Sequence, residues 1–528
     1  MINGFLNVFR LARAGALLAW HGVHVVPEDV PAPWPARVFR RLTARFHRGA
    51  EPNAEAAGLS RALAALGPSY IKAGQFLATR RDIIGPDLAT ALGRLQDRLP
   101  PFSMAEARRA IRDSLGAEPE ALFASLGEPV AAASIAQVHK ATVRQPDGSL
   151  KAVAVKILRP GVEASFRRDL GTFYFAARLA ERFHPPSRRL RPIVVVDTLA
   201  EWVRLEMDLR LEAAAMSEMA ENVARAGDPG FRVPKIDWMR TSARVMTSEW
   251  IDAIPMNDLA AIDAAGLDRE ALGNHVIRSF LRHAIRDGFF HADMHQGNLF
   301  VEPGGTLVAV DFGITGRLGP KEKRFLAEIL YGFLTRDYLR TARMHLEAGY
   351  VPPRYTVEAF AQALRSIGEP LMDRTAEEIS MARLLQQLFE VTELFDMRTR
   401  PELLLLQKTM VVVEGVARSL DPKLNIWTAA EPIVKDWIEQ QIGPRARINE
   451  GLEGVSAIAG LLTEAPRLAE QARRVSAALA ETAENGLHLD QATIDGIAAA
   501  QSAHAWPARA ALWIGALAMV TIAIKFWL

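Results

Sequence analysis

Two short stretches decide the fold: His291-Ala292-Asp293-Met294-His295-Gln296-Gly297-Asn298 and Asp311-Phe312-Gly313. Between them, the apolar runs 299–301 and 307–310 flank Glu302-Pro303-Gly304-Gly305, which is the pattern of a β-hairpin. A hairpin would bring Asn298 and Asp311 close together, as two ligands of one ion require. The alternative is a surface loop with a chance His-x-Asp, but that does not explain two polar motifs at hairpin spacing.

The residue types in these stretches are typical of a site for a nucleoside triphosphate. One aspartate contacts the reacting group, while an asparagine and a second aspartate hold Mg²⁺ against the phosphates. We therefore assign Asp293 to the reacting group and Asn298 and Asp311 to Mg²⁺, with ATP as the nucleotide. A helix is expected directly after Gly319-Pro320, which leaves no long activation segment to dock a peptide. A protein is therefore not expected as the main substrate.

The run 152–158 predicts a strand that carries Lys156 on an apolar face. A lysine there needs an anion, and Val153-Ala154-Val155-Lys156 matches the kinase strand whose lysine holds the α- and β-phosphates. The preceding stretch occupies the place of a Gly-rich phosphate loop but consists of alanine and serine. Since alanine disfavours positive φ, we expect a stiff loop with an altered nucleotide preference. The residues predicted to line the nucleotide are Val130, Ala131, Ala132, Ala133, Ser134, Ile135, Ala136, Gln137, Val138, Lys156 and Glu249.

A helix around 205–214 supplies acidic side chains. On one helix, Asp208 and Glu212 share a face and Glu206 points away from it. A kinase braces its strand lysine with one helical glutamate, and we choose Glu212 for this role. Acids on a solvated helix face are the alternative. The run 244–251 predicts a strand that leads into a hinge, whose backbone would meet the adenine edge.

A further helix is predicted over 68–77, with Pro68 in its first turn. Gly74 inside this helix costs about 1 kcal/mol relative to alanine, and a helix tolerates it where another backbone or a ligand approaches closely. Lys72 and Gln75 share one face. Taken alone, this pattern favours an ordinary exposed pair.

Composition narrows the function classes. A chain of 528 residues is long enough for more than one domain. The net charge of +2 gives no general attraction to nucleic acid, and none is expected as a partner. The sequence has no cysteine, which excludes disulfides, thiol catalysis and zinc–cysteine sites and fits a reducing compartment. Residues 14–20 are apolar, but no small-residue cleavage site follows, so a signal peptide is not favoured.

Both ends of the chain carry patterns that favour contact with lipid. Residues 1–50 hold seven arginines and only two acids, which fits either a solvated helical extension or an amphipathic face on anionic lipid. Near the other end, 510–524 is uncharged, and tryptophans flank it as interfacial anchors do. We predict a transmembrane helix over 508–528, in preference to a buried terminal helix. Ala511 and Gly515 are spaced as in paired membrane helices, which leaves a homodimer open.

Together these motifs resemble the UbiB family, the atypical kinase-like proteins of ubiquinone biosynthesis, over about residues 60–330. The signatures that carry the resemblance are Lys72-Ala73-Gly74-Gln75, the alanine-rich 131–139, Glu206-Met207-Asp208 and the two stretches quoted first. The resemblance implies that the helix with Lys72 and Gln75 folds over the active site as a lid and pairs with Glu206 and Asp208. Glu206 would then serve Lys72, while Glu212 serves Lys156.

The resemblance also implies an α+β, two-lobed protein-kinase-like fold with an N-terminal helical extension, a helical C-terminal region and a C-terminal transmembrane helix. The expected regions are the extension with the lid at 1–115, the N-lobe at 116–255, the mostly helical C-lobe at 256–445, a helical region and linker at 446–507, and the anchor at 508–528.

The implied function is that of an atypical kinase or ATPase at the inner membrane, with its catalytic domain in the cytoplasm. It would use ATP and Mg²⁺ to make polyprenyl-phenol precursors accessible to the ubiquinone-biosynthesis enzymes, especially at the hydroxylation steps. Membrane lipids, these precursors and the pathway enzymes are the implied partners. Two other functions stay open: a small-molecule phosphotransferase of the aminoglycoside-kinase type, and a nucleotide-binding pseudokinase scaffold.

Overall fold

The computed structural model describes residues 2–21, 23, 52–78, 92, 99–183, 188, 190–372, 390–391, 394–397 and 401–441. The chain divides into two compact units, Met1–Ile438 and Glu439–Leu528. The elements described below lie in the first unit, except for the last residues of helix α19.

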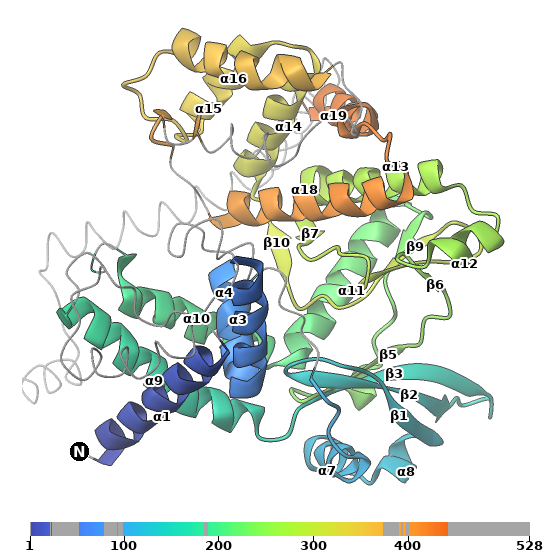
Figure 1. The fold of residues 1–528 in the computed structure, drawn as a ribbon. Coiled ribbons are helices and arrows are strands. Elements are labelled where there is room, and N and C mark those ends of the chain that lie inside the picture. Colours follow the sequence, from blue (N-terminus) through green and yellow to red (C-terminus); the bar gives the residue numbers. More distant parts are fainter. Residues whose placement is uncertain are drawn as a thin grey trace, which may run out of the picture. The chain divides into compact units, whose positions relative to one another are not determined.

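An antiparallel sheet of four strands forms the N-lobe, in the order β1-β2-β3-β5 (Figure 1). The strands are β1 (Ser125–Ala132), β2 (Ala136–Arg144), β3 (Leu150–Leu158) and β5 (Val245–Glu249). Side chains of β3 alternate, so Val153, Val155 and Ile157 are buried on one face and Lys156 points to the other. Lys156 stands opposite Val138 of β2 and Met246 of β5. The predicted strands are confirmed.

Helices α7 (Met104–Leu115) and α8 (Pro119–Leu122) precede this sheet. Ser103 caps α7 in a capping box with Glu106, which satisfies N–H groups at the helix start. Ala107 and Ile111 of α7 pack with the buried side chains of β3 in one hydrophobic cluster. The helix therefore packs with the N-lobe sheet, although the sequence assigned its residues to the N-terminal extension.

Three helices follow β3: α9 (Val162–Phe183), α10 (Pro192–Glu206) and α11 (Leu209–Ala226). The prediction of one helix over 205–214 is wrong, because α10 ends at Glu206 and a separate helix, α11, begins at Leu209. The Asp208 carboxylate accepts a hydrogen bond from the backbone N–H of Arg210 at 3.1 Å and so caps α11. Glu206 consequently ends one helix, and Glu212 stands in the first turn of the next.

The C-lobe begins with α12 (Leu259–Ala264) and α13 (Arg269–Leu281), which continues as a π-helical turn, η4 (Arg282–Asp287). Strand β7 (Phe289–His291) pairs with β10 (Thr315–Arg317). The predicted hairpin is confirmed as β8 (Leu299–Val301) and β9 (Leu307–Ala309). Its turn has Gly305 at φ +82°, a conformation that glycine adopts without strain. Strands β4 (Phe231–Arg232) and β6 (Ile254–Pro255) flank the hairpin in the order β4-β9-β8-β6.

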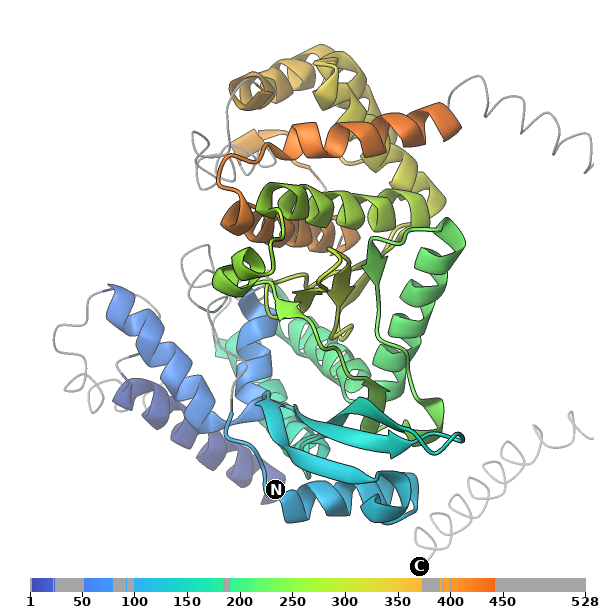
Figure 2. The ribbon, with the colours of Figure 1, turned by 90° about the vertical axis from the view of Figure 1, so that its right-hand side faces the viewer.

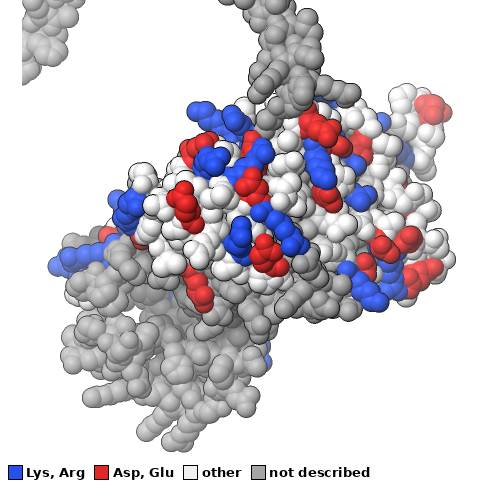
Figure 3. Space-filling model, turned by 90° about the horizontal axis from the view of Figure 1, so that it is seen from above, with Lys and Arg blue, Asp and Glu red and all other residues white. Residues whose placement is uncertain are grey.

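Helices make up the rest of the described C-lobe. Gly319 caps α14 (Pro320–Leu334), so the helix expected directly after Gly319-Pro320 is confirmed. The remaining helices are α15 (Tyr338–Glu347), α16 (Val357–Met372), α18 (Pro401–Leu420) and α19 (Ile426–Gln441). Tyr338 and Phe360 centre a separate core between α15 and α16. The face shown in Figure 3 carries interspersed basic and acidic side chains rather than one extended patch of a single sign.

Helices α1 (Ile2–Trp20), α3 (Pro52–Leu66) and α4 (Pro68–Ala78) form the described part of the N-terminal extension. Pro68 starts α4, which confirms the predicted helix. The three helices lie together, and α4 contacts α9 and α10 (Figures 1 and 2). This contact brings Lys72 of α4 to Glu206 at the end of α10.

The prediction of a C-terminal transmembrane helix, and with it an inner-membrane location, is corrected. In the part of the chain that the structure describes, no helix combines the length and the apolar character needed to cross a bilayer. The predicted span 508–528 lies outside the described residues. For the residues that the structure describes, the fold class is therefore kinase-like, with no helix that could cross a membrane.

Candidate active site

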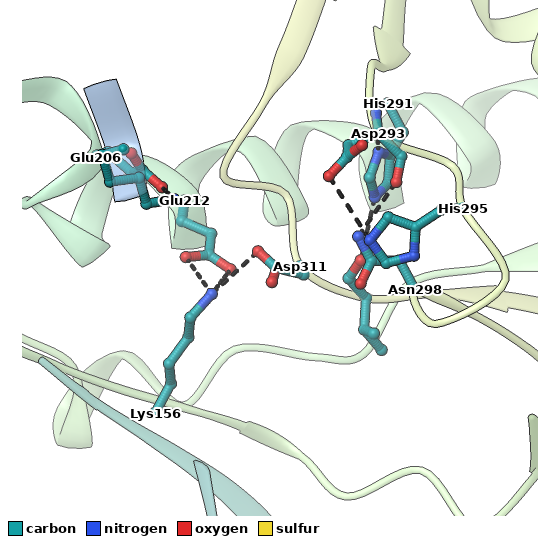
Figure 4. Close-up of polar contacts among 10 residues, drawn as sticks. Lys156, Glu206, Glu212, His291, Asp293, His295, Asn298 and Asp311 are labelled. Atoms are coloured by element: carbon teal, nitrogen blue, oxygen red, sulfur yellow. Dashed lines mark hydrogen bonds and ion pairs between the residues drawn. The ribbon is translucent and has the colours of Figure 1, made fainter. Parts of the chain in front are cut away.

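Lys156 is held by two carboxylates from different parts of the chain. Its Nζ donates to Glu212 at 2.7 and 2.9 Å and to Asp311 at 3.0 Å (Figure 4). Strand β3 supplies the lysine, the first turn of α11 supplies Glu212, and the chain after β9 supplies Asp311. The predicted pairing of Lys156 with Glu212 is confirmed, and the same ammonium joins the two lobes through Asp311.

The charges of Lys156, Glu212 and Asp311 depend on one another. Burial raises the pKa of Glu212 to about 7, although Lys156 acts in the opposite direction. Burial alone would lower the pKa of Lys156, but Asp311 and Glu212 together raise it above its usual value. Partial burial would likewise raise the pKa of Asp311, but the ammonium of Lys156 holds it well below its usual range. Lys156 and Asp311 are therefore charged at neutral pH.

Asp311 has an unusual backbone and an open side chain. Its φ is +61°, in the left-handed region that non-glycine residues seldom adopt. Its side chain is 51% exposed, whereas that of Glu212 is 7% exposed. Such strained conformations cost about 1–3 kcal/mol and concentrate at functional sites. The conformation keeps one carboxylate both paired with Lys156 and accessible.

The loop after β7 is ordered by His291, which is fully buried. Its Nε2 donates to the carbonyl of Val310 at 3.0 Å, and its Nδ1 accepts from the backbone N–H of Asp293 at 3.0 Å. These two bonds fix the neutral tautomer, and burial lowers the pKa of His291. The Nδ2 of Asn298 donates to the carbonyl of Asp293 at 3.1 Å. Residues 291, 293 and 298 thus form one hydrogen-bonded unit.

His295 is a residue of this loop to which the sequence analysis gave no role. Its Nδ1 accepts from the backbone N–H of Gly297 at 3.0 Å, so its Nε2 carries the hydrogen and lies 3.7 Å from the carboxylate of Asp293 (Figure 4). The spacing of Asp293 and His295 was visible in the motif. The direction of the ring could be known only from the fold.

The alanine-rich loop between β1 and β2 closes tightly. The N–H of Ala133 donates to the carbonyl of Ala136 at 2.8 Å, and the Arg159 guanidinium donates to the carbonyl of Ala133 at 3.3 Å. Within the predicted nucleotide-lining set, Val130 and Ala131 are exposed, Ala132, Ala133 and Val138 are half-buried, and Ser134, Ile135 and Ala136 are buried. The arrangement fits the stiff loop expected from its composition.

Gln137 has a different position from the one predicted. Its side-chain oxygen accepts from the backbone N–H of Phe102 at 2.9 Å, and its amide donates to the ring of His139 at 2.8 Å. The side chain is buried among these partners. We therefore remove Gln137 from the residues that would touch a nucleotide.

Glu249, predicted at the hinge, ends β5. Its carboxylate accepts from Arg232 at 3.3 Å, and Arg232 also binds Glu302 at 2.6 Å. The hinge is thereby tied to the turn of the β8–β9 hairpin. The backbone N–H of Glu249 donates to the carbonyl of Lys235 at 2.8 Å, so neither this N–H nor the carboxylate is open to an adenine edge.

The salt bridge between Lys72 and Glu206 that the resemblance implies is present. The ammonium of Lys72 forms a salt bridge with Glu206 and lies 5.7 Å from the ring centre of Trp202. Gln75 is half-buried on the same helix. Asp208 does not join Lys72, because its carboxylate binds the guanidinium of Arg210 at 2.6 and 2.9 Å. Only the first acid of Glu206-Met207-Asp208 therefore pairs with the lid.

The donor atoms fit Mg²⁺. Asp311 offers an exposed carboxylate, and Asn298, whose Nδ2 is engaged by Asp293, offers its side-chain oxygen. No group of three or more histidine, aspartate or glutamate side chains that could hold a metal occurs among the residues the structure describes. Mg²⁺ commonly uses one or two protein oxygens and completes its shell with water and substrate phosphates. The site therefore suits a metal that arrives with a nucleotide.

Comparisons with known proteins agree with this geometry. Residues 94–345 match the ABC1 atypical kinase-like domain, and residues 364–425 match the UbiB helical domain. A protein from Marinobacter nauticus named "Probable protein kinase UbiB" is 40% identical over 422 residues, which cover 79% of this chain and 76% of that protein. The chain belongs to the UbiB family. A protein of the same name from Aeromonas hydrophila is 38% identical over 92% of this chain and 88% of its own length.

A solved structure shares the kinase-like fold. The Rv3197–erythromycin complex from Mycobacterium tuberculosis aligns with a TM-score of 0.50 and 25% identity, over 75% of this chain and 97% of that one. In the UbiB chain, the match of the helical domain covers most of α16 and all of α18. The segment that follows the kinase-like domain is thus a distinct part of the family architecture.

Proposed function

We propose that this UbiB-family protein is an ATP- and Mg²⁺-dependent atypical kinase or ATPase that supports ubiquinone biosynthesis. The observation that carries the proposal is the contact of Lys156 with Glu212 and Asp311 beside the unit of His291, Asp293 and Asn298. A kinase-type site needs these groups together to bind and orient a triphosphate.

The chain's own residues divide the work. Lys156, braced by Glu212, would bind the phosphates, and the backbone of the alanine-rich loop would approach them. Asn298 and Asp311 would hold Mg²⁺, which neutralises charge that develops on the phosphates. Asp293 would orient the attacking hydroxyl or water, since its position is set on both sides by His291 and Asn298. The proton of that oxygen would pass to the Asp293 carboxylate.

The lid favours a substrate other than a peptide. Helix α4 is fixed through Lys72 and Glu206, and the chain enters α14 only seven residues after Gly313. A protein kinase uses a long segment at this point to dock its substrate. We propose that polyprenyl-phenol precursors, presented with phospholipid, are the partners and that pathway enzymes receive them.

ATP turnover by Asp311→Asn tests the proposal. The change removes one metal ligand and one partner of Lys156, so kcat should fall by about 100-fold or more. The control is Asp263→Asn, which makes the same change in an exposed ion pair between Asp263 of α12 and Arg269 of α13 and should leave turnover intact. Complementation of quinone synthesis in a deletion strain should fail for Asp311→Asn only.

The same assay separates the alternatives. Phospholipid vesicles with phenolic precursors should raise turnover of the wild type, while transfer of labelled γ-phosphate to a small acceptor would favour a phosphotransferase. Full complementation by Asp311→Asn at normal protein levels would reject the enzymatic proposal in favour of a scaffold.

A further inference from the structure

Helix α18 of the UbiB helical domain packs into the main core of the C-lobe. Its side chains Val413, Val416 and Ala417 are buried there, and α18 runs alongside α13 (Figures 1 and 2). The two helices approach closely at Gly273 of α13, where an added Cβ would lie 3.1 Å from the carbonyl oxygen of Ala417. Helix α18 is therefore fixed against the element that leads into the catalytic loop.

The first polar contact between α18 and that loop comes from Thr409. This side chain is fully buried, and its hydroxyl lies 3.1 Å from the carbonyl oxygen of Ala292, to which it donates. The same hydroxyl hydrogen is shared with the carbonyl oxygen of Leu405 in its own helix, at 2.8 Å. The Ala292 carbonyl belongs to the peptide that leads into Asp293, and the N–H of that peptide donates to His291. Both polar groups of the peptide before Asp293 are thus held.

The second contact lies on the other side of Asp293. The side-chain amide of Gln296 donates to the hydroxyl of Ser419, and that hydroxyl donates to the carbonyl of Val416 at 2.6 Å. Ser419 therefore both donates and accepts. Ten residues of helix separate Thr409 from Ser419, a rise of about 15 Å. One rigid helix therefore forms hydrogen bonds with the loop both before and after Asp293.

We propose that Thr409 and Ser419 are positioning residues through which the UbiB helical domain sets the orientation of Asp293. The inference rests on the proposed function for the role of Asp293, and it adds a dependence of that role on α18. Displacement of α18 would turn the Asp293 carboxylate while leaving Lys156, Glu212 and Asp311 in place. The expected signature is a loss in kcat without a matching change in the KM for ATP.

Steady-state kinetics of Thr409→Val tests this directly. The substitution keeps the shape of the side chain and removes the hydroxyl. We expect kcat to fall by roughly tenfold or more, since small misplacements of a catalytic group have large effects, with KM changing by less than about twofold. Thr409→Ser, which keeps the hydroxyl, should recover most of the wild-type kcat.

Thr341→Val is the matched control. Thr341 is also a buried helical threonine, and its hydroxyl donates to the carbonyl of Asp337 at 3.2 Å. Its helix, α15, however, packs in the separate core with α16. If Thr341→Val lowers kcat as much as Thr409→Val, or if Thr409→Ser fails to rescue, the positioning role is wrong.

Ser419→Ala and Gln296→Leu keep the inference testable if Thr409→Val does not fold. Each should lower kcat, and the double variant should be no worse than either single change, because both remove one contact. The backbone amides of residues 291–298 should exchange hydrogen faster in the same variants. This measurement does not depend on whether the enzyme turns over ATP. Unchanged exchange and unchanged kcat would overturn the inference, whereas a wild type without ATP turnover would reject the proposed function alone.

Discussion

Asp311 shows how one residue can carry several constraints. Its backbone is held at φ +61° and its carboxylate binds Lys156, yet half of the side chain stays open to solvent. A residue selected only for stability would relax the backbone or bury the ion pair. The combination fits a ligand that exchanges partners when a nucleotide arrives with its metal.

Replacing either of two buried histidines, His283 or His139, should change the stability of the protein in opposite directions. His283 is fully buried, and neither of its ring nitrogens has a hydrogen-bond partner among the described residues. Burial lowers its pKa to about 4 from the ordinary 6.5. A base with a lowered pKa contributes stability that is present above pH 6.5 and is lost as the pH falls towards 4. The loss should reach at most about 3 kcal/mol.

Urea unfolding of His283→Leu at pH 7 and pH 4.5 checks this. The variant should be more stable than the wild type by about 1–3 kcal/mol at pH 7, because two unsatisfied polar atoms disappear, and should lose less stability in acid. His139→Leu is the control of opposite sign, since the His139 ring binds Gln137 and the carbonyl of Gly127 at 2.8 Å each. A destabilised His283→Leu with an unchanged pH dependence would contradict the argument.

At the scale of elements, the sequence revealed those whose signal is local. The hairpin after Asn298 has an apolar run, a Pro-Gly-Gly turn and a second run, and α4 has Pro68 at its first position. These signals act within a few residues, so they survive without knowledge of the fold. Lys156 was found for the same reason, because a lysine on an apolar strand face needs an anion.

The features that the sequence did not reveal depend on contacts that a pattern of residue types does not show. The break between α10 and α11 was hidden because Asp208 reads as one more acid in a helical pattern until its capping bond is seen. Gln137 was assigned to the nucleotide because nothing nearby in the sequence points to Phe102. Thr409 and Ser419 carry no local signal at all, since each looks like an ordinary helical hydroxyl. The predicted membrane span rested on composition alone.

The contribution of the Lys72–Glu206 salt bridge to holding helix α4 in place can be tested by mutation. Lys72→Ala would leave the largely buried Glu206 without its ammonium partner, and removing one member of such a pair costs about 3–5 kcal/mol. Amide hydrogens of α4 should therefore exchange faster, and transfer of γ-phosphate to a peptide should become measurable as the lid loosens.

A double-mutant cycle with Glu206→Gln isolates the pair. If the salt bridge holds the lid, Lys72→Ala combined with Glu206→Gln should be more stable than Lys72→Ala alone, because the double variant no longer carries the carboxylate charge that Lys72 balanced. Wild-type exchange rates in α4 of Lys72→Ala would show that packing against α9 and α10 suffices without the ion pair.

Within the first unit, ion pairs join the two lobes, and one of them, between Lys156 and Asp311, lies in the site. Lys156 reaches across to Asp311, and Arg232 links the hinge residue Glu249 to Glu302 of the hairpin. The salt bridge between Lys72 of α4 and Glu206 adds a third link, from outside the kinase-like lobes. These links connect the segments that would have to move for a nucleotide to enter, so they also set how the parts respond to one.

A triphosphate and its metal should bind between Lys156 and the loop of Asp293. The most direct measurement is a crystal structure with Mn²⁺ and a non-hydrolysable ATP analogue, in which anomalous scattering locates the metal. We expect a peak bonded to the side-chain oxygens of Asp311 and Asn298, with phosphate oxygens within reach of the Lys156 ammonium. A metal bound elsewhere, or an analogue whose phosphates do not contact Lys156, would contradict it.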